Sequence, residues 1–148
     1  MTDPVHRVHV SVCSHPHYLD ALRDVVRDTA ALSGFGEDVA EQIVLAAVEG
    51  WTNVIRHCYA NCYEMRIDLE IRMSSEDFTL EINDYGEFVP PDKMKGRDLD
   101  DVRPGGLGLH LMNKVMDDVS HTKNDWGGTS LRLSKKIPEK DPDEEEDW

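Results

Sequence analysis

The arrangement of apolar and polar positions predicts a strand and two helices in the first part of the chain. In the segment from Val5 to Val12, apolar Val8, Val10 and Val12 alternate with polar His9 and Ser11, which is the period of a strand with one buried face. After Pro16, apolar residues recur every three to four positions, and Gly34 is expected to end this first helix. A second helix is expected from about Glu37 to Tyr59. Its apolar stripe consists of Val44, Ala47, Val48, Trp51 and Ile55.

The middle of the chain predicts a hairpin followed by a loop. Strands are expected from Met65 to Met73 and from Phe78 to Asn83, because apolar residues alternate there with charged ones. The polar residues from Ser74 to Asp77 would form the turn between them. From Gly86 to Gly105 the sequence is rich in proline, glycine and charged residues, and we expect a loop or lid.

A third helix and a second hairpin complete the predicted fold. The helix is expected from Leu107 to Val119, and the hairpin strands from Val119 to Lys123 and from Thr129 to Lys135. Because the strands form hairpins rather than βαβ units, the order of elements predicts an α+β fold. We expect the helices to cover one face of a mixed, mostly antiparallel sheet.

Composition and charge limit the classes of partner. The 148 residues suffice for one compact domain, expected at 1–137, and the acidic run at 138–148 is expected to be a disordered tail. The net charge of −14 argues against nucleic acids, which are bound mainly through Lys and Arg. Because the chain has neither a run of about 18 apolar residues nor a secretory signal, we expect no membrane partner and a cytoplasmic location.

The cysteines give little indication of a disulfide or a zinc site. Cys13, Cys58 and Cys62 are an odd number without the spacing of a disulfide framework, which favours a reducing compartment. A zinc site built from His57, Cys58 and Cys62 is an alternative, but it lacks a second Cys or His pair and the spacing supports it only weakly.

Polar residues follow a separate line along the second predicted helix. Glu49, Asn53 and His57 are spaced four residues apart and would project from one face. An amide oxygen suits a hard cation such as Mg²⁺, and a carboxylate one turn away could accept a proton. Taken alone, a solvated polar face explains this line better.

Two glycine-containing motifs come later in the chain. Asp84-Tyr85-Gly86 directly follows a predicted strand, and its glycine would let a flat ring approach the backbone, although Asp-x-Gly is also a common turn. The glycine-rich run from Gly105 leads into a helix whose first amides can bind an anion, although helix entry after a flexible loop explains it equally well. Neither a Walker A loop nor a dinucleotide-binding motif is present.

The order of these motifs resembles that of the Bergerat-fold, or GHKL, ATPases. Their N, G1, G2 and G3 boxes are matched by Glu49-x3-Asn53, Asp84-x-Gly86, Gly106-x-Gly108 and Gly128-Thr129. Within that superfamily, the phrases at 49–59, 105–112 and 116–119 resemble the small anti-sigma-factor serine kinases, and the resemblance covers about residues 5–137. It implies a two-layer sandwich that uses ATP and Mg²⁺.

The resemblance implies roles for the polar residues of the second helix. Asn53 would bind the Mg²⁺ that bridges the phosphates, and Glu49 would be the general base toward the substrate hydroxyl. His57 matches a family position beside the nucleotide site with a supporting role. Arg103, in the lid just before the glycines, is our candidate for contacting the terminal phosphate.

The resemblance also implies which residues hold the base and the phosphates. Asp84 would accept the exocyclic amine of adenine, with Gly86 and Thr129 beside the ring. The phosphates would be lined by Gly105, Gly106, Leu107, Gly108 and Leu109. The family's first glycine box often has a second glycine where this chain has Phe88, which could reshape the base site.

By resemblance, the protein is expected to phosphorylate a serine of a STAS-type anti-anti-sigma protein and to sequester a sigma factor. Relatives are often dimers, so a homodimer is also expected. A nucleotide-controlled binding module without catalysis is the main alternative, and Glu49 argues against it because binding alone needs no carboxylate there. The ATPase half of a histidine kinase is less favoured, because no helix with a phospho-accepting histidine precedes the domain in this sequence; a longer parent chain would reopen that alternative.

Overall fold

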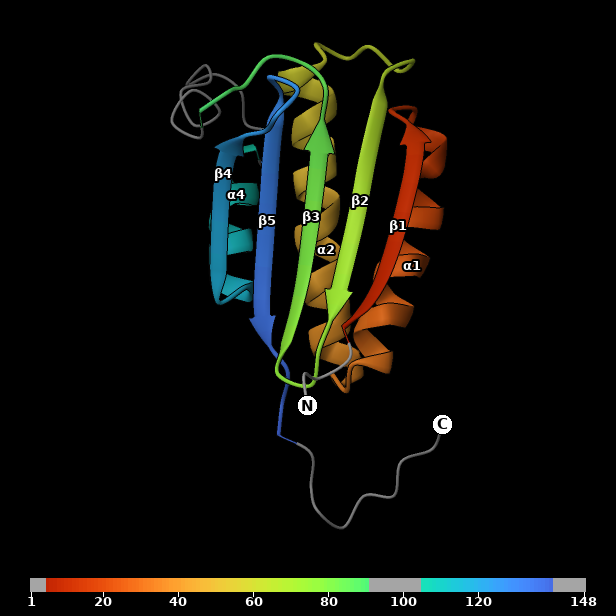
Figure 1. The fold of residues 1–148 in the computed structure, drawn as a ribbon, viewed down its shortest axis with the longest axis vertical. Coiled ribbons are helices and arrows are strands. Elements are labelled where there is room, and N and C mark those ends of the chain that lie inside the picture. The colour runs from red at the N-terminus through yellow and green to blue at the C-terminus, as the bar shows by residue number, and fades with distance from the viewer. Residues whose placement is uncertain (1–4, 91–104, 140–148) are drawn as a thin grey trace.

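The computed structural model describes residues 5–90 and 105–139, which form a sheet and a layer of helices (Figure 1). Five strands within these residues are arranged in the order β1-β2-β3-β5-β4. They are β1 (His6–Cys13), β2 (Arg66–Met73), β3 (Asp77–Asp84), β4 (Asp118–Lys123) and β5 (Thr129–Lys136). The predicted α+β class is confirmed. Every strand pair in the described part is antiparallel, so this sheet is more uniform than the mixed sheet expected.

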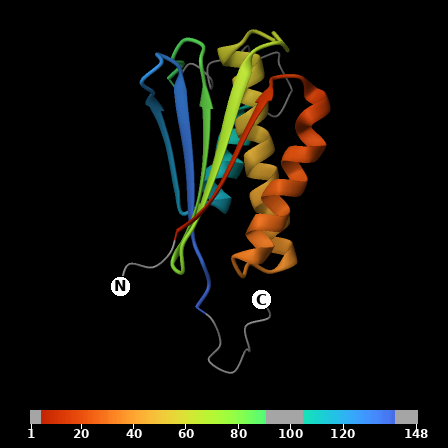
Figure 2. The same cartoon turned by 45° about the vertical axis from the view of Figure 1, so that its right-hand side comes forward.

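The helices cover one face of the sheet (Figure 2). They are η1 (Pro16–Tyr18), α1 (Leu19–Leu32), α2 (Glu37–Asn53), η2 (Val54–Cys58) and α4 (Gly105–Val115). Because α2 packs against both α1 and α4, it occupies the middle of this layer. The core lies between the layers and includes the fully buried Trp51 of α2 and Phe78 of β3. No helix in the described segments is long and apolar enough to cross a membrane.

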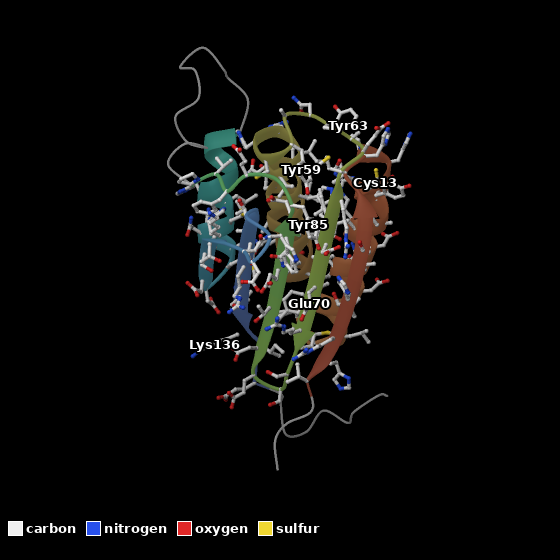
Figure 3. All side chains as sticks on the ribbon, turned by 45° about the horizontal axis from the view of Figure 1, so that its top comes forward. Cys13, Tyr59, Tyr63, Glu70, Tyr85 and Lys136 are labelled. Carbon is white, nitrogen blue, oxygen red and sulfur yellow. The ribbon has the colours of Figure 1, made fainter. Side chains whose placement is uncertain are left out.

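The strand register explains why alternation in the sequence predicted the sheet. Leu69 of β2 lies opposite Val10 of β1 and Ile82 of β3, and Ile82 lies opposite Leu131 of β5. Side chains alternate between the two faces of a strand, so these apolar residues share the face that the helices cover. The residues between them, such as Glu70 (labelled in Figure 3), lie on the open face. Burial of one face therefore specifies the register.

The first two helices end in different ways. Gly34 follows α1 with φ +105°, a left-handed conformation that favours glycine and agrees with the predicted helix end. The second helix begins at Glu37 as predicted, but its regular α-helical part ends at Asn53. The next residues, Val54–Cys58, form a π-helical turn that the apolar periodicity did not predict.

The predicted end of the third helix was wrong. We expected a helix from Leu107 to Val119, whereas α4 spans Gly105–Val115. The Asp117 N–H donates to the Ser134 carbonyl at 2.9 Å, and its Oδ2 accepts the Lys136 N–H at 2.7 Å. These bonds join the chain to β5, so β4 begins at the next residue.

Two predicted regions lie outside the described residues. One is the part of the predicted lid at 91–104, which includes Arg103. The other is the part of the predicted tail at 140–148. The division into a domain at 1–137 and a tail at 138–148 therefore stays a prediction.

Candidate functional site

Asp84 is the last residue of β3 and is 0% exposed. Its Oδ1 accepts the backbone N–H groups of Gly86 at 3.0 Å and Thr129 at 3.2 Å. Its Oδ2 is also buried, yet it accepts no hydrogen bond from the described residues. Burial raises the pKa of Asp84, whereas the two backbone hydrogen bonds and the neighbouring Cys58 thiol act in the opposite direction. One carboxylate oxygen is thus held by two backbone amides, and the other can still accept a donor.

The turn between β4 and β5 is fastened to the end of β3. The Asn124 side-chain amide donates to the carbonyl oxygens of Asp84 at 2.8 Å and Thr129 at 3.2 Å. The Asn124 Oδ1 accepts the Gly128 N–H at 2.9 Å. A Cβ on Gly128 would lie 2.2 Å from the Asp84 carbonyl oxygen, so a side chain does not fit there. The sequence predicted this turn, but only the tertiary contacts identify Asn124 as the residue that holds Asp84.

The end of η2 packs against the segment that leaves β3. Figure 3 shows this end of the molecule with Tyr59 and Tyr85 labelled. The Tyr59 hydroxyl accepts the Tyr85 N–H at 2.8 Å and donates to the Arg66 carbonyl. Burial raises the pKa of Tyr59 to about 12, so the hydroxyl keeps its proton. A Cβ on Gly86 would lie 2.7 Å from the Cys58 carbonyl oxygen, so this contact itself requires glycine.

Asn53 ends α2 and is only 3% exposed. Neither its Oδ1 nor its Nδ2 has a hydrogen-bond partner among the described residues. Buried polar groups nearly always have partners, and an unsatisfied one costs about 1–3 kcal/mol. The alternative of a solvated polar face is therefore wrong for Asn53. Its amide oxygen fits the divalent cation implied by the resemblance, because Mg²⁺ takes oxygen ligands.

Glu49 lies one helical turn before Asn53 and is partly buried. Burial raises the pKa of Glu49, and the positive charge of Arg56 acts in the opposite direction. Gly50 lies between Glu49 and Asn53 in the sequence, and a Cβ on it would lie 2.5 Å from Leu131 Cδ2. Glycine at this position lets α2 lie directly against β5, so Glu49 and Asn53 are presented by a helix held close to the sheet.

Cys58 is a site residue that the sequence reasoning missed. It ends η2, and its Sγ lies 3.9 Å from Oγ1 of Thr129. Burial and then the negative charge of Asp84 raise the pKa of Cys58 to about 12. Cys58 was considered only for a zinc site, and across 5–90 and 110–139 no three His, Cys, Asp or Glu side chains are grouped to hold a metal. Its neighbour His57 is partly exposed, and its supporting role stays a prediction.

The predicted phosphate-binding run forms the beginning of α4. The backbone is helical from Gly105 onward, so the run from Gly105 to Leu109 lies in the first turns of this helix. Figure 1 shows α4 beginning at the same end of the molecule at which β3 and α2 end. Segments far apart in the sequence are thus brought to one end of the sandwich. Arg103, the candidate for the terminal phosphate, lies outside the described residues.

The fold and the motif order define an ATPase domain of the histidine-kinase-like class. The profile of the histidine kinase-like ATPase domain matches residues 12–135, and the chain belongs to this family. The serine-protein kinase RsbW of Oceanobacillus iheyensis is 26% identical over 95% of this chain and 92% of its own length. RsbW of Bacillus subtilis is 26% identical over 88% of this chain and 85% of its own length. The predicted resemblance to anti-sigma-factor serine kinases is confirmed.

A solved structure supports the same fold. It contains the RsbU and RsbW domains of Rv1364c from Mycobacterium tuberculosis and superposes with a TM-score of 0.65 at 17% identity. The match covers 90% of this chain and 32% of that chain, so this protein spans about a third of its length.

Proposed function

We propose that the protein is an ATP-dependent protein-serine kinase that phosphorylates a STAS-type anti-anti-sigma protein and, in its free state, sequesters a sigma factor. One observation carries the proposal: Asn53 and Asp84 are both buried and both keep polar atoms that no described residue satisfies. These are the two positions at which the family motifs need a metal ligand and a base acceptor. Family membership supports ATP use, and the relatives named as serine-protein kinases support the reaction.

In this proposal Asp84 reads the base. Its free Oδ2 accepts the exocyclic amine of adenine, while the amides of Gly86 and Thr129 hold Oδ1 in place. The phosphates extend toward the first amides of α4, which are unsatisfied within a helix and favour an anion. Asn53 would hold Mg²⁺ through its amide oxygen, and a bound Mg²⁺ neutralises charge on the phosphates.

Glu49 is the proposed general base. The substrate serine oxygen forms a bond to the γ-phosphorus, the bond from that phosphorus to the oxygen of ADP breaks, and the hydroxyl proton passes to the Glu49 carboxylate. Partial burial raises the pKa of Glu49, which makes its carboxylate a stronger proton acceptor. Arg103 is proposed to stabilise negative charge on the transferred phosphoryl group.

A non-catalytic binding module is the second candidate, because the same polar atoms would also bind nucleotide without transfer. The partly buried Glu49 favours the kinase, since a module that only binds ATP gains nothing from a desolvated carboxylate. A kinase of this kind would act in the cytoplasm. We also propose that it forms a homodimer, because related kinases are often dimers.

The direct test is phosphoryl transfer. The purified chain is incubated with Mg²⁺, γ-labelled ATP and each STAS-domain protein encoded in the same genome. We expect label on a serine of one STAS protein, and the Asn53→Ala variant should lose the transfer. Normal ATP binding without transfer to any STAS protein would instead support the binding module.

A further inference from the structure

The thiol of Cys58 lies among the residues proposed to hold the base. Its Sγ is 3.9 Å from the hydroxyl of Thr129, which is 2% exposed. The Thr129 backbone N–H in turn donates to Asp84, whose buried Oδ2 meets no hydrogen-bond partner within the described part of the chain. The negative charge of the Asp84 carboxylate and a hydrogen bond between the two side chains also help to raise the pKa of Cys58. We call Cys58, Asp84, Gly86 and Thr129 the base site.

Packing prevents Cys58 from moving away from this site. Its carbonyl oxygen lies 2.7 Å from the position that a Gly86 Cβ would occupy, so the backbone of η2 rests directly on the segment after β3. The following residue, Tyr59, is buried and bonded to both Tyr85 and Arg66. The side chain at position 58 is therefore fixed beside Asp84 and Thr129, and a larger group there must take space from the site.

We propose that Cys58 is a base-contacting residue, whose thiol packs against the adenine ring beside Asp84. This inference rests on the proposed ATP binding and deepens it. A cysteine suits the position because it behaves as a small, polarisable hydrophobic group. Its raised pKa keeps the thiol neutral at pH 7, so it places no second negative charge beside Asp84. A neutral thiol is only a weak donor toward Asp84, and a carboxylate oxygen has a second lone pair, so Oδ2 can still accept the adenine amine.

Nucleotide protection tests this contact in the unaltered protein. Iodoacetamide alkylates a thiolate: a C–S bond forms, the C–I bond breaks, iodide leaves and the thiol proton goes to solvent. The rates at Cys58 and at the exposed Cys62 are followed by peptide mass spectrometry at alkaline pH, with and without Mg²⁺-ADP. We expect ADP to slow labelling of Cys58 at least about fivefold, as burial of an accessible thiol would, and to leave Cys62 unchanged. Equal labelling of Cys58 in both conditions overturns the proposal.

A matched pair of variants tests it without relying on reactivity. Cys58→Met adds bulk inside the base site, and Cys62→Met adds the same bulk at an exposed position. By calorimetry, Cys58→Met should weaken the binding of ATP and of ADP equally, by at least about tenfold or about 1.4 kcal/mol, because the added bulk takes space from the bound ring. Cys62→Met should bind both as the parent does, and the unfolding temperature of each variant checks that it is folded.

The outcomes separate this inference from the proposed function. Tight nucleotide binding by both variants overturns the role of Cys58 alone. Failure of the unaltered protein to bind ATP or ADP overturns the proposed function and, with it, the inference. If Cys58→Met does not fold, the protection of Cys58 in the unaltered protein decides.

Discussion

The side-chain amide of Asn124 donates to the backbone carbonyl of Asp84 at 2.8 Å, across the gap between the β4–β5 turn and the end of β3. The same side chain accepts the N–H groups of Trp126 at 3.1 Å and Gly128 at 2.9 Å. A single residue on the turn thus accepts hydrogen bonds from backbone N–H groups of the turn and fixes the strand end that carries Asp84.

We therefore predict that Asn124→Ala weakens both the fold and the base site. The substitution leaves part-buried backbone groups unsatisfied, so the free energy of unfolding should fall by about 1–3 kcal/mol. ATP affinity should fall as well, because Asp84 loses its support. Urea unfolding and calorimetry measure the two effects. Asp125→Ala, an exposed change in the same turn, should do neither, and equal behaviour of the two variants would contradict the role of Asn124.

The raised pKa of Asp84 predicts a pH dependence with a definite sign. An ionised carboxylate accepts the adenine amine more strongly than a neutral acid does, so ATP affinity should fall as the pH drops through the folded pKa of Asp84. Stability should change in the opposite direction. Because the folded pKa exceeds the unfolded value of about 3.9, the folded state binds the proton more tightly and gains stability as the pH falls through this window. The dependence would be measured by calorimetry and urea unfolding over a pH series.

Asp84→Asn is the control for both effects. The variant cannot titrate at this position, so the difference between the parent and variant pH profiles isolates Asp84. Parallel profiles of ATP affinity would show that the carboxylate does not read the base.

The buried amide of Asn53 is expected to lower the stability of the fold while serving the function. Its two amide atoms are buried and have no partner among residues 5–90 and 110–139, so Asn53→Leu, which is similar in volume, should raise the free energy of unfolding by about 1–3 kcal/mol. The same change should remove the Mg²⁺ dependence of ATP binding, because the oxygen ligand is lost. Gln42→Leu, at an exposed position of the same helix, should leave stability within about 0.5 kcal/mol. A clear loss of stability in Asn53→Leu would mean that its amide has a partner after all.

Local patterns predicted most of the fold because one face of each strand is buried. The pairing of Leu69 with Ile82 follows directly from alternating apolar positions. The boundary between α4 and β4 could not be predicted in this way. It depends on bonds from Asp117 to Ser134 and Lys136, which are distant in sequence. The π-helical turn at Val54–Cys58 also has no signature in an apolar period.

The candidate site was predicted only where a family motif marks it. Asn53 and Asp84 were singled out by motif order, whereas the burial of their polar atoms away from any partner in the described segments is a property of the tertiary structure. Cys58 and Asn124 contact neighbours that folding brings to them, Thr129 in one case and Asp84 in the other. A single cysteine or a turn asparagine carries no signal of such a role in the sequence.

Glu49 distinguishes a kinase from a binding module most directly. Glu49→Gln keeps the shape of the side chain and removes its basicity, and Glu37→Gln at an exposed position of the same helix serves as the control. In single-turnover assays with γ-labelled ATP and the STAS protein, we expect Glu49→Gln to transfer phosphate at least about 100-fold more slowly than the parent. Calorimetry should show that it binds Mg²⁺-ATP within a few-fold of the parent. A transfer rate equal to that of Glu37→Gln would contradict general-base catalysis by Glu49, and no transfer by the parent itself would contradict the kinase.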